Sequence, residues 1–259
     1  MVKKYSNKWA LILGGSSGLG YASALELAQQ GMNLIIVYRA SRMMMEKVNS
    51  DFEQLKSYGI ELIAFNKDAT RSIVVDEISQ ALVTKNIKLH ILLHSIAKGN
   101  LKPISKEQDS LTSQDFEQTV SSMGLSLYTW SMQLLKKDLF DKPARIISFT
   151  SEGSSRVLPG YAAVSAAKTT LESITRSLAV ELAPYQISSI CIQAGVTLTQ
   201  SLSRIPGVDQ IIDKTKKRNP FNRLTQPQDI ARVVELMCDP ASFWINGDVI
   251  KVDGGEHLR

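Results

Sequence analysis

Two side chains able to handle a proton and a polarised oxygen, Tyr161 and Lys168, lie seven positions apart in the segment GYAAVSAAK. Because seven residues make nearly two turns of an α-helix, a helix here would place both side chains on one face, about 10 Å apart along its axis. A phenol can protonate or hydrogen-bond a carbonyl oxygen, and an ammonium group can hold a sugar hydroxyl beside it. A tyrosine packed in the core and a solvent-exposed lysine are the alternatives at these two positions.

A cluster of glycines follows the first apolar run and opens a predicted helix, in the segment GGSSGLG. Glycines let a backbone turn sharply and approach a ligand without interference from a Cβ atom. The N-terminus of the helix then offers free N–H groups and the positive end of the helix dipole to an anion such as a pyrophosphate. An ordinary strand-to-helix turn is the alternative. Cofactor contacts are predicted for Gly14, Ser16, Ser17, Gly18, Leu19 and Gly20.

These residues belong to a regular alternation of predicted strands and helices. Apolar runs without alternation are typical of strands buried on both faces of a parallel sheet. We therefore predict one α/β domain over residues 1–259, a Rossmann-type doubly wound parallel sheet of about seven strands with helices on both faces. The strands are expected at 9–13, 34–37, 62–65, 89–93, 146–149, 187–192 and 249–252, and the helices at 18–30, 41–57, 71–84, 112–139, 160–183 and 227–238.

The segment 193–222 interrupts this alternation after a predicted strand. Long insertions at the carboxyl edge of such a sheet commonly form lids over ligands, so we expect a substrate lid at 196–222, with a plain surface excursion as the alternative. A short amphipathic helix there could cover a groove or only the core. The basic run at 214–218 is either solvated surface or a docking site for an acidic partner. The apolar positions of the lid are Leu198, Leu202, Ile205, Val208, Ile211 and Ile212.

The composition is that of an ordinary globular protein, with 259 residues, 44% of them hydrophobic, 21% charged, and a net charge of +5. No apolar run approaches the ~20 residues of a membrane-spanning helix. The N-terminus lacks the long apolar stretch of a signal peptide. Cys191 and Cys238 have no metal-ligand spacing, so we expect free thiols in the cytoplasm and no metal site. The chain has neither zinc-ligand spacing nor an arginine-rich arm, so we expect no nucleic-acid binding.

The spacing Gly-x-x-x-Gly-x-Gly after the first strand resembles that of the short-chain dehydrogenase/reductase family, and the resemblance covers nearly the whole chain. It implies a nicotinamide dinucleotide bound at the glycine loop. The second predicted strand is followed by Arg39, where an acidic residue would bind a 2′-hydroxyl. An arginine suits an adenosine 2′-phosphate instead and favours NADPH over NADH. Asp68 matches the family's adenine-contacting acid. A solvated Arg39 and a helix-capping Asp68 are the alternatives.

Several positions depart from the common family pattern and resemble its enoyl-acyl-carrier-protein reductases. In most members the tyrosine stands four residues before the lysine, where this chain has Val164, and an asparagine stands where it has Met123. The chain has instead Tyr-x6-Lys, HSIA at 94–97, a serine pair at 121–122 and AG-x3-T at 194–199. Together these motifs resemble the enoyl reductases. Many of those enzymes carry a second tyrosine ten residues before the first, where this chain has Ser151, and this mixture resembles their NADPH-dependent variant.

The resemblance implies a role for each site residue. Tyr161 would stabilise an enolate by a hydrogen bond to the thioester oxygen, which lies farther from the hydride-accepting carbon than a ketone oxygen does. Lys168 would hold the nicotinamide-ribose hydroxyls. Ser151 occupies the family's catalytic serine position, and its role stays open between a hydrogen bond to substrate or Tyr161 and a plain strand end. Further cofactor contacts are implied for Ala69, Ser95, Ile96, Ala97, Ala194, Gly195 and Thr199.

The activity implied is NADPH-dependent reduction of the trans-2 double bond of an enoyl thioester in fatty-acid elongation, with the acyl chain on acyl carrier protein. Reduction of a ketone, quinone or dienoyl thioester, or a non-catalytic NADP-binding regulator, are the alternatives. The resemblance also suggests that the helices at 112–139 and 160–183 pair across a two-fold axis in a homodimer or homotetramer. Their surplus apolar residues include Phe116, Leu127, Trp130, Leu134 and Leu178.

Overall fold

One parallel sheet organises the protein. The computed structural model describes residues 3–105, 109–199, 202–204 and 208–259. Within them a seven-stranded sheet has the order β3-β2-β1-β4-β5-β6-β7, with every neighbouring pair parallel. The strands are β1 Trp9–Leu13, β2 Asn33–Tyr38, β3 Leu62–Asn66, β4 Leu89–His94, β5 Phe140–Ser151, β6 Ile187–Ala194 and β7 Val249–Val252. The predicted fold class is confirmed.

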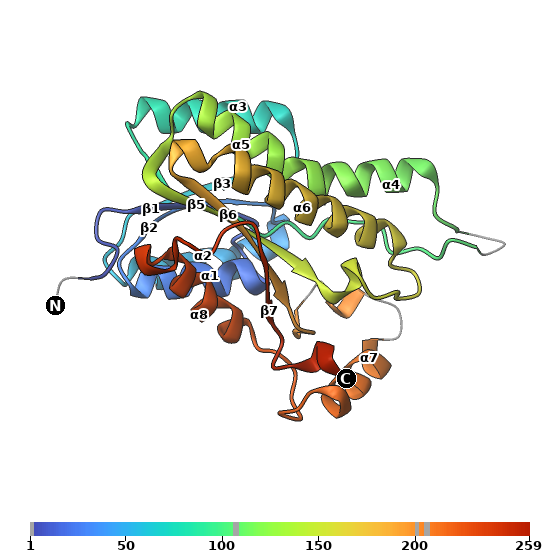
Figure 1. Ribbon diagram of the computed structural model, residues 1–259. Coiled ribbons are helices and arrows are strands. Elements are labelled where there is room, and N and C mark those ends of the chain that lie inside the picture. The colour runs from blue at the N-terminus through green and yellow to red at the C-terminus, as the bar shows by residue number, and fades with distance from the viewer. Residues whose placement is uncertain (1–2, 106–108, 200–201, 205–207) are drawn as a thin grey trace.

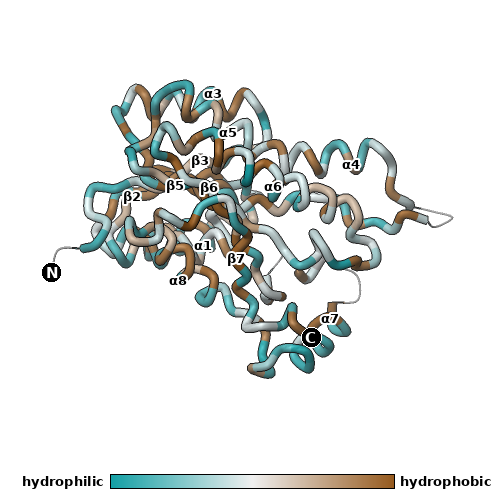
Figure 2. Tube along the Cα trace, in the orientation of Figure 1, coloured by the Kyte–Doolittle hydropathy of each residue, from teal (hydrophilic) through white to brown (hydrophobic). Residues whose placement is uncertain are grey.

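Helices cover both faces of this sheet (Figure 1). One apolar core lies between the sheet and α1 (Gly18–Gln29), α2 (Met45–Lys56) and α8 (Pro227–Cys238). A second core lies on the other face, against α3 (Ser72–Thr84), α5 (Ser126–Lys136) and α6 (Ala162–Glu181). Hydrophobic residues gather along the strands between the two helical layers (Figure 2). Burial on both faces explains why the strands are apolar without alternation.

The predicted helix at 112–139 is divided into two. α4 (Ser113–Val120) begins at a capping box between Thr112 and Asp115, and a π-helical turn at Ser121–Leu125 separates it from α5. The π turn aims Met123 inward, where its side chain is only 3% exposed. Such turns inside α-helices are frequent at functional sites.

Most of the apolar residues assigned to a two-fold interface lie in the core of the protein itself. Leu127, Trp130, Leu134 and Leu178 are buried in the protein's own core, so they are no surplus, and that part of the argument for oligomers was wrong. The large apolar side chains that remain exposed on these helices are Leu125, Tyr128 and Val180.

The described part of the expected lid contains a 3-10 turn at Leu202–Arg204 and helix α7 (Val208–Arg218). Ile205 of the predicted apolar series lies outside the described residues, as do positions 200–201 and 206–207. α7 lies beside the C-terminus, away from the two helical layers (Figure 1). In the described part of the chain, no helix is both long enough and apolar enough to cross a membrane.

Candidate active site

The predicted site residues meet at the carboxyl edge of the sheet. Strand order reverses between β1 and β4, and ligands of open α/β sheets bind beyond the strand ends at such a point. The glycine loop follows β1, Ser95 follows β4, Ser151 ends β5 and Ala194 ends β6. Residues far apart in the sequence therefore surround one site.

The glycine loop forms a close-packed cradle. Gly14 has φ +88°, and a Cβ atom there would lie 2.3 Å from the carbonyl oxygen of Ser95. A Cβ on Gly20 would lie 2.2 Å from the carbonyl oxygen of Gly14. Ser17 precedes α1 without a side-chain hydrogen bond to the helix, and the first turn contains no acidic residue. The N–H groups of α1 are thus free of a capping side chain and fit the pyrophosphate of a dinucleotide.

Charged side chains gather after β2 and β3, where the adenosine end of a dinucleotide would lie. Asp68 accepts hydrogen bonds from Lys98 at 2.8 Å, from Arg39 at 3.4 Å, and from the hydroxyl and N–H of Thr70. Burial alone would raise the pKa of Asp68, but Lys98 and Thr70 outweigh it and hold the pKa well below its usual value. Two cations facing one carboxylate leave a positive excess that suits a phosphate. Lys98 was not among the predicted residues.

The remaining predicted cofactor residues lie around this cradle. Thr199 is adjacent to Gly18, since a Cβ on Gly18 would lie 3.5 Å from Thr199 Cγ2. The N–H of Ser95 donates to Leu13, and the carbonyl of Ala69 accepts from the Trp130 indole at 2.8 Å. Ile96 is buried in the core, whereas Ala97 is exposed. The side chains of Ala69 and Ile96 are thus packed into the apolar core.

Tyr161 lies directly before α6 and not on it, with φ −112° and ψ 3°. The expectation that Tyr161 and Lys168 share one helix face was therefore wrong for the tyrosine. Its hydroxyl lies 3.2 Å from Ser151 Oγ. Its ring packs onto Gly153, where a Cβ atom would lie only 2.5 Å from ring carbon Cε1. Gly153, which the sequence analysis missed, thus leaves the space that the ring occupies.

The phenol of Tyr161 is suited to donate a hydrogen bond. Burial raises its pKa, and the bond with Ser151 only partly offsets this effect. The group therefore stays protonated at neutral pH. Val164, one turn into α6, is buried against Met123 and Ala167. The usual tyrosine position of the family is thus apolar core in this chain.

Lys168 is buried on α6, and its Nζ donates to the carbonyl oxygen of Phe149 at 2.7 Å. An ammonium group has three donors, so this bond leaves others for a ligand's hydroxyls. Burial lowers the pKa of Lys168 to about 8, against the weaker opposing effects of Cys191 and Glu172. The side chain is therefore mostly charged at pH 7 and loses its proton just above that pH.

Replacing Lys168 by methionine should stabilise the protein at pH 7 while impairing cofactor binding. The folded-state pKa of Lys168 is about 8, against an ordinary 10.5, and this difference corresponds to a cost of roughly 3 kcal/mol for burying its charge. Methionine removes that cost but loses the hydrogen bond to Phe149, which is worth about 1 kcal/mol. Between pH 8 and 10.5 the unfolded wild type binds more protons, so wild-type stability rises with pH and the advantage of the variant shrinks. Urea unfolding at pH 7 and pH 10 measures this difference. Lys216→Met, at an exposed lysine, is the matched control and should show no such convergence.

His94 ends β4 beside Lys168. Ser126 Oγ donates to the carbonyl of Ser122 at 2.6 Å and so accepts from His94 Nε2 at 2.8 Å. Burial, with a smaller contribution from Lys168, lowers the pKa of His94 to about 3. A neutral imidazole fixed in this way holds the strand end to the start of α5, which is a structural role.

Charged residues next to Ser151 were not predicted as part of the site. Glu152 forms a bidentate ion pair with Arg218, at 2.7 and 2.6 Å. Arg218 had been grouped with the solvated basic run at 214–218, and that grouping was wrong because its side chain is only 14% exposed. The adjacency of Glu152 to Ser151 was the one sequence signal available.

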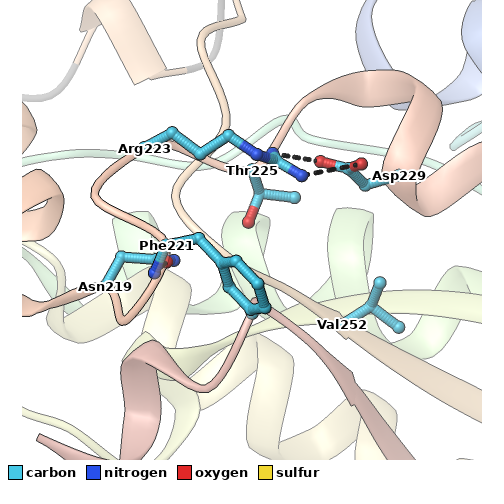
Figure 3. A pocket seen from close by; sticks show the side chains of 7 residues that line it. Asn219, Phe221, Arg223, Thr225, Asp229 and Val252 are labelled. Carbon is cyan, nitrogen blue, oxygen red and sulfur yellow. Dashed lines mark hydrogen bonds and ion pairs between the residues drawn. The ribbon is translucent and has the colours of Figure 1, made fainter.

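A cavity of about 210 Å³ lies beyond β7, among residues of the connection from α7 to α8 (Figure 3). It is separate from Tyr161 and Ser151, neither of which lines it. Gly195 lies close to its wall, since a Cβ there would meet Thr225 Oγ1 at 2.2 Å. The ion pair of Arg223 with Asp229 borders the cavity.

Comparison with known proteins identifies the family of this fold. The family model described as "Enoyl-(Acyl carrier protein) reductase" matches residues 14–257. A 3-oxoacyl-[acyl-carrier-protein] reductase of Staphylococcus epidermidis is 25% identical over 254 residues, covering 97% of this chain and 100% of that protein. A short-chain dehydrogenase from Burkholderia cenocepacia, solved in complex with NADP, superposes with a TM-score of 0.85 at 25% identity, covering 98% of this chain and 99% of that one.

The enoyl-[acyl-carrier-protein] reductase (NADH) of Aquifex aeolicus has the same TM-score, 0.85, at 23% identity, with 98% of each chain covered, which shows the fold alone. The family model matches nearly the whole chain and therefore shows the family as well as the fold. The chain therefore belongs to the short-chain dehydrogenase/reductase family of oxidoreductases, within the group that the enoyl-(acyl carrier protein) reductase model describes.

Proposed function

We propose that the protein uses NADPH to reduce the trans-2 double bond of an enoyl thioester. The observation that favours this reaction is the place of the phenol. Tyr161 stands before α6 with its hydroxyl next to Ser151, while the usual tyrosine position, one turn farther along the helix, is the buried Val164. A proton donor displaced in this way suits an oxygen that is displaced from the carbon receiving hydride.

The chemistry of an enoyl thioester has that displacement. The reduced nicotinamide supplies hydride to C3, whereas negative charge develops on the thioester oxygen attached to C1. Tyr161 donates a hydrogen bond to this oxygen and stabilises the enolate, an interaction that is stronger in the transition state than in the ground state. Ser151 orients the phenol through its own hydroxyl. Lys168 holds ribose hydroxyls and places the hydride donor.

NADPH is proposed over NADH because of the charges near Asp68. Arg39 and Lys98 together exceed the charge of Asp68 and can accept a 2′-phosphate. The NADP bound in the Burkholderia cenocepacia relative is consistent with this choice.

Reduction of a 3-oxoacyl thioester is the second candidate. The hydrogen-bonded Ser151–Tyr161 pair could equally serve a ketone oxygen, and the Staphylococcus epidermidis relative is a 3-oxoacyl reductase. The deciding assay follows NADPH and NADH oxidation with a trans-2-enoyl thioester and, in parallel, with a 3-oxoacyl thioester. Preference for the enoyl substrate supports the proposal, and preference for the oxo substrate replaces it by the second candidate. Tight NADPH binding without turnover on any acyl thioester would indicate a regulator instead.

Acyl carrier protein is the proposed carrier of the substrate. Lys214, Lys216 and Lys217 are exposed on α7, a helix of the expected lid, and would attract an acidic carrier. Replacing all three by glutamate should raise KM for an enoyl-acyl-carrier-protein roughly tenfold at low salt, and less at high salt. A neutral enoyl-N-acetylcysteamine thioester is the control substrate, and its KM should not change. Equal effects on both substrates would contradict carrier docking here.

A further inference from the structure

Three charged residues from distant parts of the chain meet beside Ser151. Glu152 follows the serine, Arg218 is the last residue of α7, and Glu256 belongs to the C-terminal turn Glu256–Leu258. Arg218 binds both oxygens of Glu152, at 2.7 and 2.6 Å, and Glu256 Oε1 at 3.2 Å. The three side chains are 19%, 14% and 1% exposed for Glu152, Arg218 and Glu256. We call this cluster the Arg218 bridge.

The Arg218 bridge has a fixed geometry. A planar guanidinium that holds a carboxylate through two parallel hydrogen bonds defines the orientation of both groups. Glu256 is held in addition by the N–H of Val196 at 3.2 Å, and Glu152 by Arg156 at 3.2 Å. Buried pairs of this kind add little net stability, yet removing one partner leaves a charge without compensation. Such a cluster therefore serves mainly to fix the relative orientation of the segments that carry its side chains.

Glu152, at one end of the bridge, lies in the chain between two residues that contact Tyr161. Ser151, on one side of Glu152 in the chain, is hydrogen-bonded to the hydroxyl of Tyr161. Gly153, on the other side, packs against the tyrosine ring. Any shift of Glu152 therefore moves both contacts that fix the phenol, and its partner Arg218 belongs to α7, a helix of the expected lid.

We infer that Arg218 is a positioning residue, which fixes α7 and the Ser151–Gly153 loop relative to each other and thereby aligns the Tyr161 hydroxyl with a bound acyl thioester. This inference rests on the proposed role of Tyr161. The ligand affected is the acyl chain and its thioester, since Arg218 and Glu152 have no hydrogen bond to any described residue assigned to the cofactor. Only Glu256 reaches a segment with such residues, through the N–H of Val196.

The chain contains a matched control. Arg223 also forms a bidentate ion pair with a carboxylate, Asp229, at 2.6 and 3.2 Å, and lies five residues beyond Arg218 (Figure 3). That pair joins the connection after α7 to the start of α8 and touches none of the residues around Tyr161 that the structure describes. Arg218→Met and Arg223→Met therefore each remove a bidentate arginine–carboxylate pair, at a site-linked and an unlinked place. The Arg223 pair is the more exposed, with 51% of the arginine side chain accessible against 14% for Arg218.

The experiment compares the two variants with the wild type on whichever acyl thioester the wild type reduces, so that a wrong choice of substrate does not decide it. Arg218→Met should raise KM for the thioester and lower kcat, each by roughly tenfold or more, because a misplacement near 1 Å is costly in rate. The Kd of NADPH should change less than about twofold. Arg223→Met should leave all three constants near wild type.

A readout that does not depend on activity is digestion by endoproteinase Lys-C, which cleaves after lysine and so ignores the replaced arginine. Cleavage at Lys214, Lys216 and Lys217 should be faster in Arg218→Met than in Arg223→Met, because α7 is released from the loop. Should Arg218→Met fail to fold, Glu152→Gln, which keeps the size and the acceptor oxygen, decides by the same measurements. Kinetics and digestion that match those of Arg223→Met overturn the inference. Wild-type kinetics in Arg218→Met, with faster digestion retained, overturn the positioning of Tyr161 by Arg218 and leave only the attachment of α7.

Discussion

Replacing Tyr161 by phenylalanine is expected to lower kcat for a trans-2-enoyl thioester by roughly 10²- to 10³-fold, the usual effect of removing one donor to a developing oxyanion. The hydroxyl is the only part removed, so the ring still packs on Gly153 and the fold is preserved. The Kd of NADPH should stay within about twofold of wild type, because the phenol acts on substrate. Single-turnover kinetics with NADPH in excess measure the chemical step directly.

A tyrosine moved to the usual family position tests the assignment in the opposite direction. In Tyr161→Phe/Val164→Tyr the phenol stands one turn nearer Lys168, in a place now occupied by apolar core around Met123. We expect no recovery of enoyl reduction in this double variant. Wild-type enoyl reduction by it would show that Tyr161 is not the donor.

Gly14→Ala should abolish productive cofactor binding. The new Cβ would lie 2.3 Å from the carbonyl oxygen of Ser95, and a φ of +88° is unfavourable for alanine. The φ penalty alone is about 1–2 kcal/mol. Relief of the clash must separate the loops after β1 and β4, so the Kd of NADPH should rise at least ~100-fold, the cost of a site displaced by about 1 Å. Fluorescence titration with NADPH and a thermal unfolding curve measure both effects.

Gly59→Ala is the control for this prediction. Gly59 has φ +72°, and a Cβ atom there would meet nothing within 4 Å. This variant should lose about 1–2 kcal/mol of stability and keep its affinity for NADPH. If both variants bind NADPH equally well, the close contact between Gly14 and Ser95 has no part in cofactor binding.

The strands were predictable because burial on both faces leaves a direct mark in the sequence. β1 and β7 have the predicted bounds, and the other strands except β5 differ by one or two residues. β5 begins at Phe140, well before the predicted Ile146. The extra residues include Arg145, which looks incompatible with a central strand. Its guanidinium is satisfied by the carbonyls of Ile245 and Ser242, about a hundred positions away. No local pattern could reveal those partners.

The candidate site was predictable where its chemistry follows strand ends, and not where it depends on pairs of distant residues. Tyr161, Ser151 and Lys168 were identified from spacing and resemblance, and the structure brings Ser151 and Tyr161 into contact. Arg218 was mistaken for solvated surface, because its neighbours Lys216 and Lys217 are exposed and its partners lie 66 and 38 positions away. The helix start after Tyr161 was missed by two residues, since Gly160 and Tyr161 are compatible with either state.

The backbone contacts of the glycine cradle have a consequence for the energetics of ligand association. Gly20 lies against Gly14, and Gly14 against Ser95, so the glycine loop and the segment after β4 are held together by main-chain contacts before any dinucleotide arrives. Little conformational freedom remains there to be lost on complex formation, and such preorganisation retains more of the contact energy as affinity. The same rigidity leaves Gly14 and Gly20 without room for a side chain, so adaptation to other cofactors is expected at the periphery, at Arg39 and Lys98.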